Sequence, residues 1–131
     1  MSNINQTIIV RTDLFNLPED IGLLSAQIAH IHMEQIRQKL SDHDKEFNEL
    51  ENNWIRDPYL LVKKVSNKES LEYFAEKAIG SGITCTKWHD TVYVRISSET
   101  KKAFPNVLVG ISLGPDDSDL IRTVVEDLPL L

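Results

Sequence analysis

Residues 107–115, VLVGISLGP, are apolar at nearly every position. Side chains alternate between the two faces of a β-strand, so a strand of this composition is buried on both sides, as a central strand would be. A sheet with such a strand has a layer of helices on each face. This segment therefore predicts an α/β domain, and the rest of the chain has to supply the covering helices.

The remaining sequence alternates between short β-branched runs and amphipathic stretches. Further strands are expected over residues 7–12, 58–65, 83–88 and 91–96. Helices are expected over about 19–40, 41–54, 66–80 and 116–128. Asn16 and Ser66 are in position to cap the first and third of these helices. The order predicts one three-layer α/β/α domain over residues 1–131, with helices covering both faces of the sheet. Trp54 belongs to the expected helix 41–54, which either offers a partner surface or folds back onto the sheet.

The net charge of −6 and the pI near 5.1 bear on the class of partner. Proteins that hold nucleic acid through many phosphates normally carry a basic patch. Basic residues here gather only locally, so they are either solvated strand and loop positions or one positive face on an acidic body. The residues concerned are Lys63, Lys64, Lys87, Arg95, Lys101 and Lys102.

The single cysteine, Cys85, excludes an intramolecular disulfide and a multi-cysteine zinc site. Within the stretch GITCTKW, we interpret this thiol as a small buried side chain and not as a nucleophile. The first ten residues contain neither a basic region nor an apolar run long enough for a signal peptide or a membrane span. We therefore expect a cytoplasmic protein that does not bind a membrane.

Usual catalytic and cofactor motifs are missing: there is no glycine-rich phosphate loop, no G-x-S-x-G elbow and no cysteine pair. The stretch HIH, residues 30–32, resembles a metal site, but residues two apart on a helix point in nearly opposite directions. We accordingly expect neither a metal nor a cofactor.

One polar stripe runs along the first expected helix. Leu23, Gln27, His30 and Glu34 are spaced by four, three and four residues, which places them on one side of the helix, beside an apolar core stripe. Gln27 and His30 have two interpretations. They either satisfy backbone groups at the edge of the sheet or belong to an active site. His89 and Asp90, at the end of an expected strand, also have two interpretations: they form a simple turn or contribute to an active site.

The order of several segments resembles that of the type II peptidyl-tRNA hydrolases. The matching stretches are IIVRTDL, GLLSAQIAH, KKVSNKESLEYFAEKAIGSGITCTKWHD, VGISLGP and the terminal LPLL, which together cover nearly the whole chain. The resemblance implies a mixed, four-stranded sheet between helices, a dimer, and hydrolysis of the ester that joins a peptide to tRNA. It also implies that Gln27, His30 and Asp90 are catalytic. Asp13 matches the Asp of the R-[TN]-D-L pattern and is expected to bind substrate.

The chain departs from the family pattern at several site positions. Leu23 stands where the family has a lysine, four residues before the glutamine. Val92, Val94 and Arg95 replace the glycine, threonine and glutamine that follow the family aspartate, and Val107 aligns with a second threonine. Hydrolysis needs a base, a positioned water and donors for the oxyanion.

Asp90 is the candidate base and Gln27 a candidate donor. Arg95, Lys87 and His89 are the candidates to replace the missing positive charge and bind substrate. Two hypotheses therefore stay open. The chain is either a divergent hydrolase of peptidyl-tRNA or another acylated substrate, or a non-catalytic relative that binds a protein, a ligand or RNA.

Overall fold

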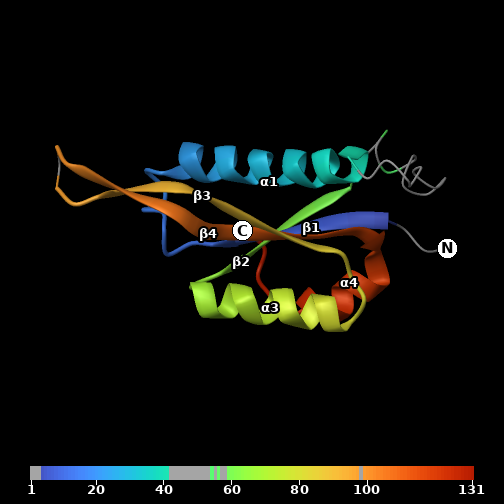
Figure 1. Ribbon diagram of the computed structural model, residues 1–131. Helices are drawn as coiled ribbons and strands as arrows, with labels where there is room; N and C mark the ends of the chain where they lie inside the picture. Colours follow the sequence, from blue (N-terminus) through green and yellow to red (C-terminus); the bar gives the residue numbers. More distant parts are fainter. Residues whose placement is uncertain (1–3, 42–53, 55, 57–58, 98) are drawn as a thin grey trace.

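The computed structural model describes residues 4–41, 54, 56, 59–97 and 99–131. Its strands are β1 (Ile4–Arg11), β2 (Leu60–Val65), β3 (Cys85–Arg95) and β4 (Lys101–Asp117). Its helices are α1 (Ile21–Ser41), α3 (Lys68–Gly80) and α4 (Ser118–Val125). The four strands form one sheet in the order β2-β1-β4-β3. Helix α1 covers one face of this sheet, and α3 and α4 cover the other (Figure 1). The expected three-layer arrangement is therefore confirmed.

The sheet is mixed, because β1 pairs with β2 in parallel and with β4 in antiparallel orientation. Strand β4 lies between β1 and β3, so the apolar segment 107–115 is a central strand, as the sequence predicts. Residues 108–115 of this strand are all buried. A strand with apolar side chains on both faces can be buried in this way only between two helical layers.

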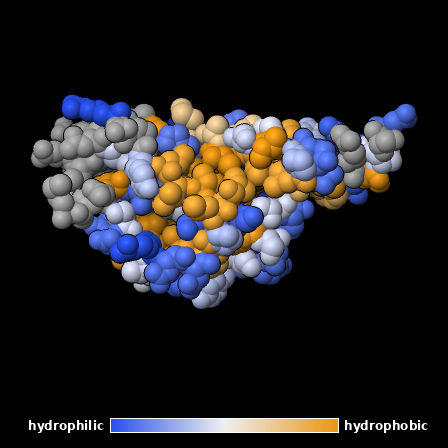
Figure 2. Space-filling view, turned by 180° about the vertical axis from the view of Figure 1, so that it is seen from behind, coloured by the Kyte–Doolittle hydropathy of each residue, from blue (hydrophilic) through white to orange (hydrophobic). Residues whose placement is uncertain are grey.

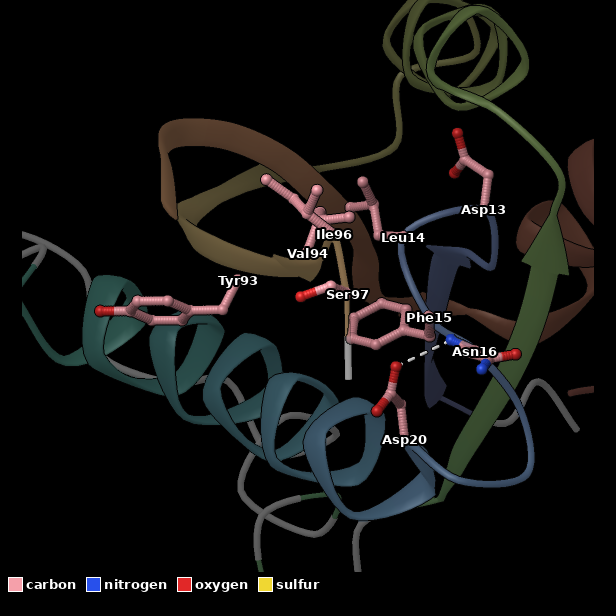
Figure 3. Close-up of a pocket in the computed structure, with 9 residues that line it drawn as sticks. All are labelled: Asp13, Leu14, Phe15, Asn16, Asp20, Tyr93, Val94, Ile96 and Ser97. Carbon is pink, nitrogen blue, oxygen red and sulfur yellow. Dashed lines mark hydrogen bonds between the residues drawn. The ribbon is translucent and has the colours of Figure 1, made fainter. Parts of the chain in front are cut away.

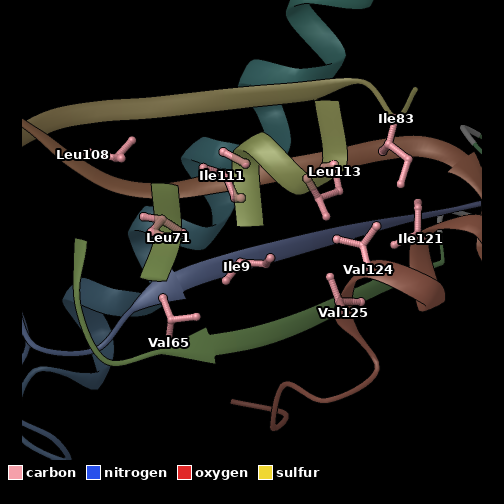
Figure 4. Close-up of a cluster of buried hydrophobic side chains, with 12 residues drawn as sticks. Ile9, Val65, Leu71, Ile83, Leu108, Ile111, Leu113, Ile121, Val124 and Val125 are labelled. Atoms are coloured by element: carbon pink, nitrogen blue, oxygen red, sulfur yellow. The ribbon is translucent and has the colours of Figure 1, made fainter. Parts of the chain in front are cut away.

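The α1 layer packs on a small core of Ile8, Val10, Leu24 and Ile31. Gly110 of β4 allows the close approach of this helix, since an added Cβ atom would lie 2.7 Å from Ile31 Cδ1 and 2.8 Å from the carbonyl oxygen of Ile9. The larger core lies on the opposite face, where side chains of β1, β4, α3 and α4 meet (Figure 4). Burial of these aliphatic side chains is the main favourable contribution to folding.

Strand β3 differs from its prediction. The sequence predicts two strands, 83–88 and 91–96, with a turn or strand end at His89 and Asp90, but the structure has one continuous strand. Its pairing with β4 shifts register between Trp88 and His89 and again between Asp90 and Val92. The alternation of apolar and polar residues in the sequence is interrupted at these irregularities, so the sequence predicts two strands, 83–88 and 91–96, instead of one.

Two helix starts also differ from their predictions. Helix α3 is capped by Asn67, whose side chain accepts a hydrogen bond from the Ser70 amide, so the expected cap at Ser66 is wrong by one residue. Helix α1 begins at Ile21, several residues after Asn16, because residues 17–20 form turns.

The helix expected over residues 41–54 lies, apart from its two end residues, outside the described residues. Trp54 is described. Its side chain is only 4% exposed, donates to the carbonyl oxygen of Tyr59 and packs edge-on against His32 of α1. Trp54 itself therefore folds back onto the body of the protein. No helix among the described residues is long and apolar enough to cross a membrane.

The two edges of the sheet differ: the end of the chain covers β2, whereas β3 continues beyond the helices. The last residues of the chain run along β2, where the Lys64 amide donates to Pro129, the Leu131 amide donates to Val62, and Leu130 pairs with Lys63. At the other edge, the ends of β3 and β4 project beyond the helices as a two-stranded arm (Figure 1). We call residues 91–97 and 99–106 the arm.

The side chain of Cys85 packs partly against the larger core. Burial raises the pKa of its thiol to about 11, from an ordinary value of 9.0. This difference of two pKa units leaves roughly a hundredfold less thiolate, the reactive form, near pH 8. We expect alkylation by iodoacetamide at pH 8 to be at least tenfold slower in the native protein than in urea, measured by mass spectrometry. Equal rates in the two states would contradict a shielded Cys85.

Candidate active site

A chain of hydrogen bonds joins α1 to β3. Gln27 Nε2 donates to Asp90 Oδ2 at 3.1 Å, and Trp88 Nε1 donates to Gln27 Oε1 at 2.8 Å. The second carboxylate oxygen of Asp90 accepts the Thr91 amide at 2.7 Å. Residues 63 positions apart in the sequence thus meet at one place between helix and sheet.

Strand and helix geometry explains this meeting. Trp88 and Asp90 are two residues apart on β3, and their hydrogen bonds to Gln27 show that both side chains lie on the face of the sheet that α1 covers. Gln27 projects from α1 toward both. An indole N–H can only donate, and therefore it fixes the amide of Gln27 with its oxygen toward Trp88 and its nitrogen toward Asp90. Gln27 and Asp90 are both half-buried, and the other hydrogen on Gln27 Nε2 has no partner among the described residues.

His30 and Leu23 lie on the same side of α1 as Gln27. The exposed ring of His30 is 5.9 Å from that of Trp88, centroid to centroid. Leu23, one turn before Gln27, is 53% exposed. Val107 of β4 is the direct pairing partner of Asp90. Because paired residues of antiparallel strands project from the same face, Val107 is a close neighbour of the carboxylate.

None of the cationic side chains that the structure describes forms an ion pair with Asp90. Lys87 and His89 are exposed and flank Trp88 on β3. The backbone of Arg95 lies at the end of β3, and its side chain is outside what the structure describes. Lys102, near the tip of the arm, places Nζ 5.1 Å from the centre of the Phe104 ring. Of the two interpretations of the basic residues, a positive face around Gln27 and Asp90 is not seen among the side chains that the structure describes.

Asp13 is held by an arginine. Both carboxylate oxygens accept hydrogen bonds from Arg11, at 2.8 Å from Nε and 2.7 Å from Nη2. The guanidinium also donates to the carbonyl oxygen of Leu108 at 3.3 Å, which fixes it against β4. The hydrogen bonds from Arg11 lower the pKa of Asp13, so this carboxylate stays ionised and paired at neutral pH.

An open groove of about 520 Å³ lies between the loop after β1 and the arm. Its walls are the loop after β1, the residue that precedes α1 and the arm (Figure 3). The lining residues are Asp13, Leu14, Phe15, Asn16, Asp20, Tyr93, Val94, Ile96 and Ser97.

The two histidines of the HIH stretch point to different places. His30 lies beside Trp88, whereas His32 Nδ1 lies 2.6 Å from Oε1 of the buried Gln6. Burial lowers the pKa of His32, which favours its neutral form. Within the described part of the chain, no group of three or more His, Cys, Asp or Glu side chains could hold a metal ion.

Comparison with known proteins identifies the family. The family "Peptidyl-tRNA hydrolase PTH2" matches residues 4–131, which includes every helix and strand described above. The chain belongs to the peptidyl-tRNA hydrolase PTH2 family. One curated relative is the peptidyl-tRNA hydrolase of Nanoarchaeum equitans (strain Kin4-M), 28% identical over 110 residues that cover 83% of this chain and 86% of the relative.

Two residues that hold the candidate site residues in place were not predicted from the sequence. Trp88 and Arg11 were not among the expected site residues, although each lies two positions before one of them in the sequence, Asp90 and Asp13. For Trp88 and Asp90, which both belong to β3, this spacing is that of side chains on one face of a strand. This spacing could have indicated Trp88 as a neighbour of Asp90. The hydrogen bond from Trp88 to Gln27, however, depends on how α1 packs on β3, which local sequence does not determine.

Proposed function

We propose that this PTH2 family member hydrolyses the ester bond between a peptide and tRNA, at a divergent active site formed by Gln27 and Asp90. The observation that supports this proposal is the hydrogen bond from Gln27 Nε2 to Asp90 Oδ2. It places a carboxylate beside an amide whose second hydrogen has no acceptor among the described residues. The curated relative, which covers most of the chain, is named a peptidyl-tRNA hydrolase.

In the proposed mechanism, Asp90 accepts a proton from a water molecule as the oxygen of that water attacks the ester carbonyl. The carbonyl oxygen becomes negatively charged and accepts the free hydrogen of Gln27 Nε2. The tetrahedral intermediate then expels the ribose oxygen of the tRNA, which receives a proton. His30, exposed on the same side of α1, is the proposed donor of this proton, and it is reprotonated from Asp90 through solvent. The products are a peptide carboxylate and a tRNA with a free hydroxyl.

The proposed site is weaker than one that contains a cation. Leu23 contributes no charge, and Gln27 is the one side-chain donor that the described residues offer to the oxyanion. Loss of one oxyanion donor typically costs about 100- to 1000-fold in rate. We therefore propose a slow hydrolase, with Lys87, His89, Arg95 and Asp13 contributing to substrate binding rather than to the chemical step.

The test is hydrolysis of a purified peptidyl-tRNA by the purified protein, followed by the release of deacylated tRNA. A rate that is proportional to protein concentration and that follows the protein through two different chromatographic steps is expected. As a matched control, Glu76→Gln on α3 changes an exposed carboxylate on the opposite helical layer and should leave the rate unchanged. If no hydrolysis exceeds the rate without protein, the proposed activity is wrong.

The absence of a described cation at Asp90 favours a second candidate, a non-catalytic binding module for RNA, a protein or a ligand. This alternative predicts that the protein binds tRNA or another partner without turnover. Filter binding of deacylated tRNA, whose steep salt dependence reports phosphate contacts, separates the two only together with the hydrolysis assay: binding without hydrolysis supports the binding module.

Trp88 is expected to act as a positioning residue, since its indole N–H determines which end of the Gln27 amide faces Asp90. Trp88→Phe keeps an aromatic ring but removes that N–H, so the amide can turn over and present its oxygen to the carboxylate. We expect kcat to fall about tenfold with little change in KM, in line with loss of one net hydrogen bond. Trp54→Phe is the matched control, because it removes the other indole N–H of the chain, away from Asp90. A KM effect without a kcat effect would contradict this role.

Homodimerisation in the cytoplasm is a further proposal, drawn from the resemblance to the type II hydrolases. It is supported by a broad apolar area in the middle of one face of the molecule (Figure 2). Areas of this kind on soluble proteins mark interaction surfaces. Light scattering after size-exclusion chromatography is expected to give twice the chain mass of 14.9 kDa. A mass that stays at that of one chain at all concentrations would overturn the dimer.

A further inference from the structure

The groove between the loop after β1 and the arm combines apolar walls with negative charge. Figure 3 shows Leu14 and Phe15, from the loop after β1, facing Val94 and Ile96 of the arm. Ile96 is 63% exposed and Tyr93 62%, so both side chains are accessible to a ligand in the groove. The volume of the groove, about 520 Å³, is in the range of small-ligand sites.

Among the lining residues that the structure describes, two are carboxylates and none is cationic. Asp13 is already neutralised by its two hydrogen bonds from Arg11. Asp20 accepts a hydrogen bond from the Asn16 amide at 2.8 Å, and it forms no ion pair with any described residue. The uncompensated charge of the groove is therefore that of Asp20. A phosphate group would be repelled there, whereas an ammonium or guanidinium group would be attracted.

Two elements of the chain, α1 and β3, lead from the Gln27–Asp90 pair to residues that line the groove. Asp20 immediately precedes α1 and lies seven residues before Gln27, a rise of about 10 Å along a helix. Tyr93 lies three residues after Asp90, about 10 Å along a strand. A substrate whose ester carbonyl is at Asp90 would therefore reach the groove with the next two or three residues of a peptide.

We propose that this groove binds the peptide part of the substrate, with a preference for an apolar residue followed by a positively charged one. The apolar side chain packs between Phe15 and Ile96, and the cation lies at Asp20. The tRNA part lies outside the groove. This inference rests on the proposed function, because it assigns the acyl side of the same reaction.

The proposal is tested without catalysis, by NMR titration of the isotope-labelled full chain with three probes. The probes are N-acetyl-leucyl-lysine amide, N-acetyl-leucyl-glutamate amide and the trinucleotide CCA. We expect the lysine peptide to shift the backbone amides of Asn16, Asp20 and Ser97 and to bind about two- to fivefold more tightly than the glutamate peptide, as for a solvent-accessible ion pair. Asp20→Asn should abolish this preference, because it retains the shape and an acceptor oxygen for the Asn16 amide. Glu76→Gln, with the same change of charge on α3, should keep it.

Three results would overturn the peptide groove. The first is a shift of these same amides by CCA, which would assign the groove to the tRNA end. The second is a lysine preference that survives Asp20→Asn. The third is the absence of any shift with either peptide. A protein that binds the lysine peptide here but does not hydrolyse peptidyl-tRNA would refute the proposed hydrolase and leave the groove assignment intact.

Discussion

Asp90→Asn is expected to reduce hydrolysis of peptidyl-tRNA by at least 100-fold. An amide cannot accept a proton from water at neutral pH, so the substitution removes the proposed base while it keeps the size of the side chain. It also creates a conflict of donors, because the new carboxamide at this position meets both the Thr91 amide and Gln27 Nε2, and its own nitrogen can accept neither bond. We expect the loss in kcat, measured at saturating substrate.

The matched control is Asp116→Asn. Asp116 is half-buried like Asp90 and accepts the amide of the following residue at 2.8 Å, but it lies at the far end of β4, opposite Asn5. This variant should retain full activity. If Asp90→Asn also retains activity while its thermal unfolding is normal, Asp90 is not the base and any hydrolysis has another origin.

Leu23→Lys is expected to increase the rate of hydrolysis about 10- to 100-fold. The new ammonium group would extend from α1 one turn before Gln27, on the exposed side next to Asp90, where negative charge develops on the oxyanion. Its expected effect is comparable to that of one oxyanion donor, less the cost of ordering a flexible side chain. Adding Val107→Thr places a hydroxyl directly across from Asp90 and should raise the rate further.

A lysine could also improve tRNA binding simply through its charge. Ala29→Lys is the control for this effect, because Ala29 is exposed on the opposite side of α1 from Leu23 and Gln27. It should lower KM at most, whereas Leu23→Lys should raise kcat. Equal gains in kcat from the two lysines would show that Leu23 has no special relation to the proposed chemistry.

Local sequence was sufficient for the layers and for the polar stripe on α1. The doubly apolar segment 107–115 is the central strand, and the stripe through Leu23, Gln27 and His30 lies on one side of α1 as its spacing predicts. Their meeting with Asp90 was expected only through the family resemblance. The chemistry of the residues alone left Gln27 and His30 open to a purely structural interpretation.

Features that depend on pairing between distant segments were not predictable in the same way. The arm is one example. Residues 101–106 are exposed and carry lysines and a proline, yet they extend β4 because β3 is there to pair with them. The groove is another, because it joins Asp20, Phe15 and Ile96 from three separate parts of the chain. Each of these depends on long-range packing that overrides local preference.

The sheet order also fixes when the domain can form during translation. Strand β1 is made first, but its antiparallel neighbour β4 is complete only at Asp117, and the β2 edge is covered only by residues 129–131. A nascent chain that ends before Lys101 therefore holds β1 and β2 without the strand that completes the centre of the sheet, and their apolar faces stay open to chaperones or to aggregation. The sheet of this domain is therefore complete only after residues 101–131 have been synthesised.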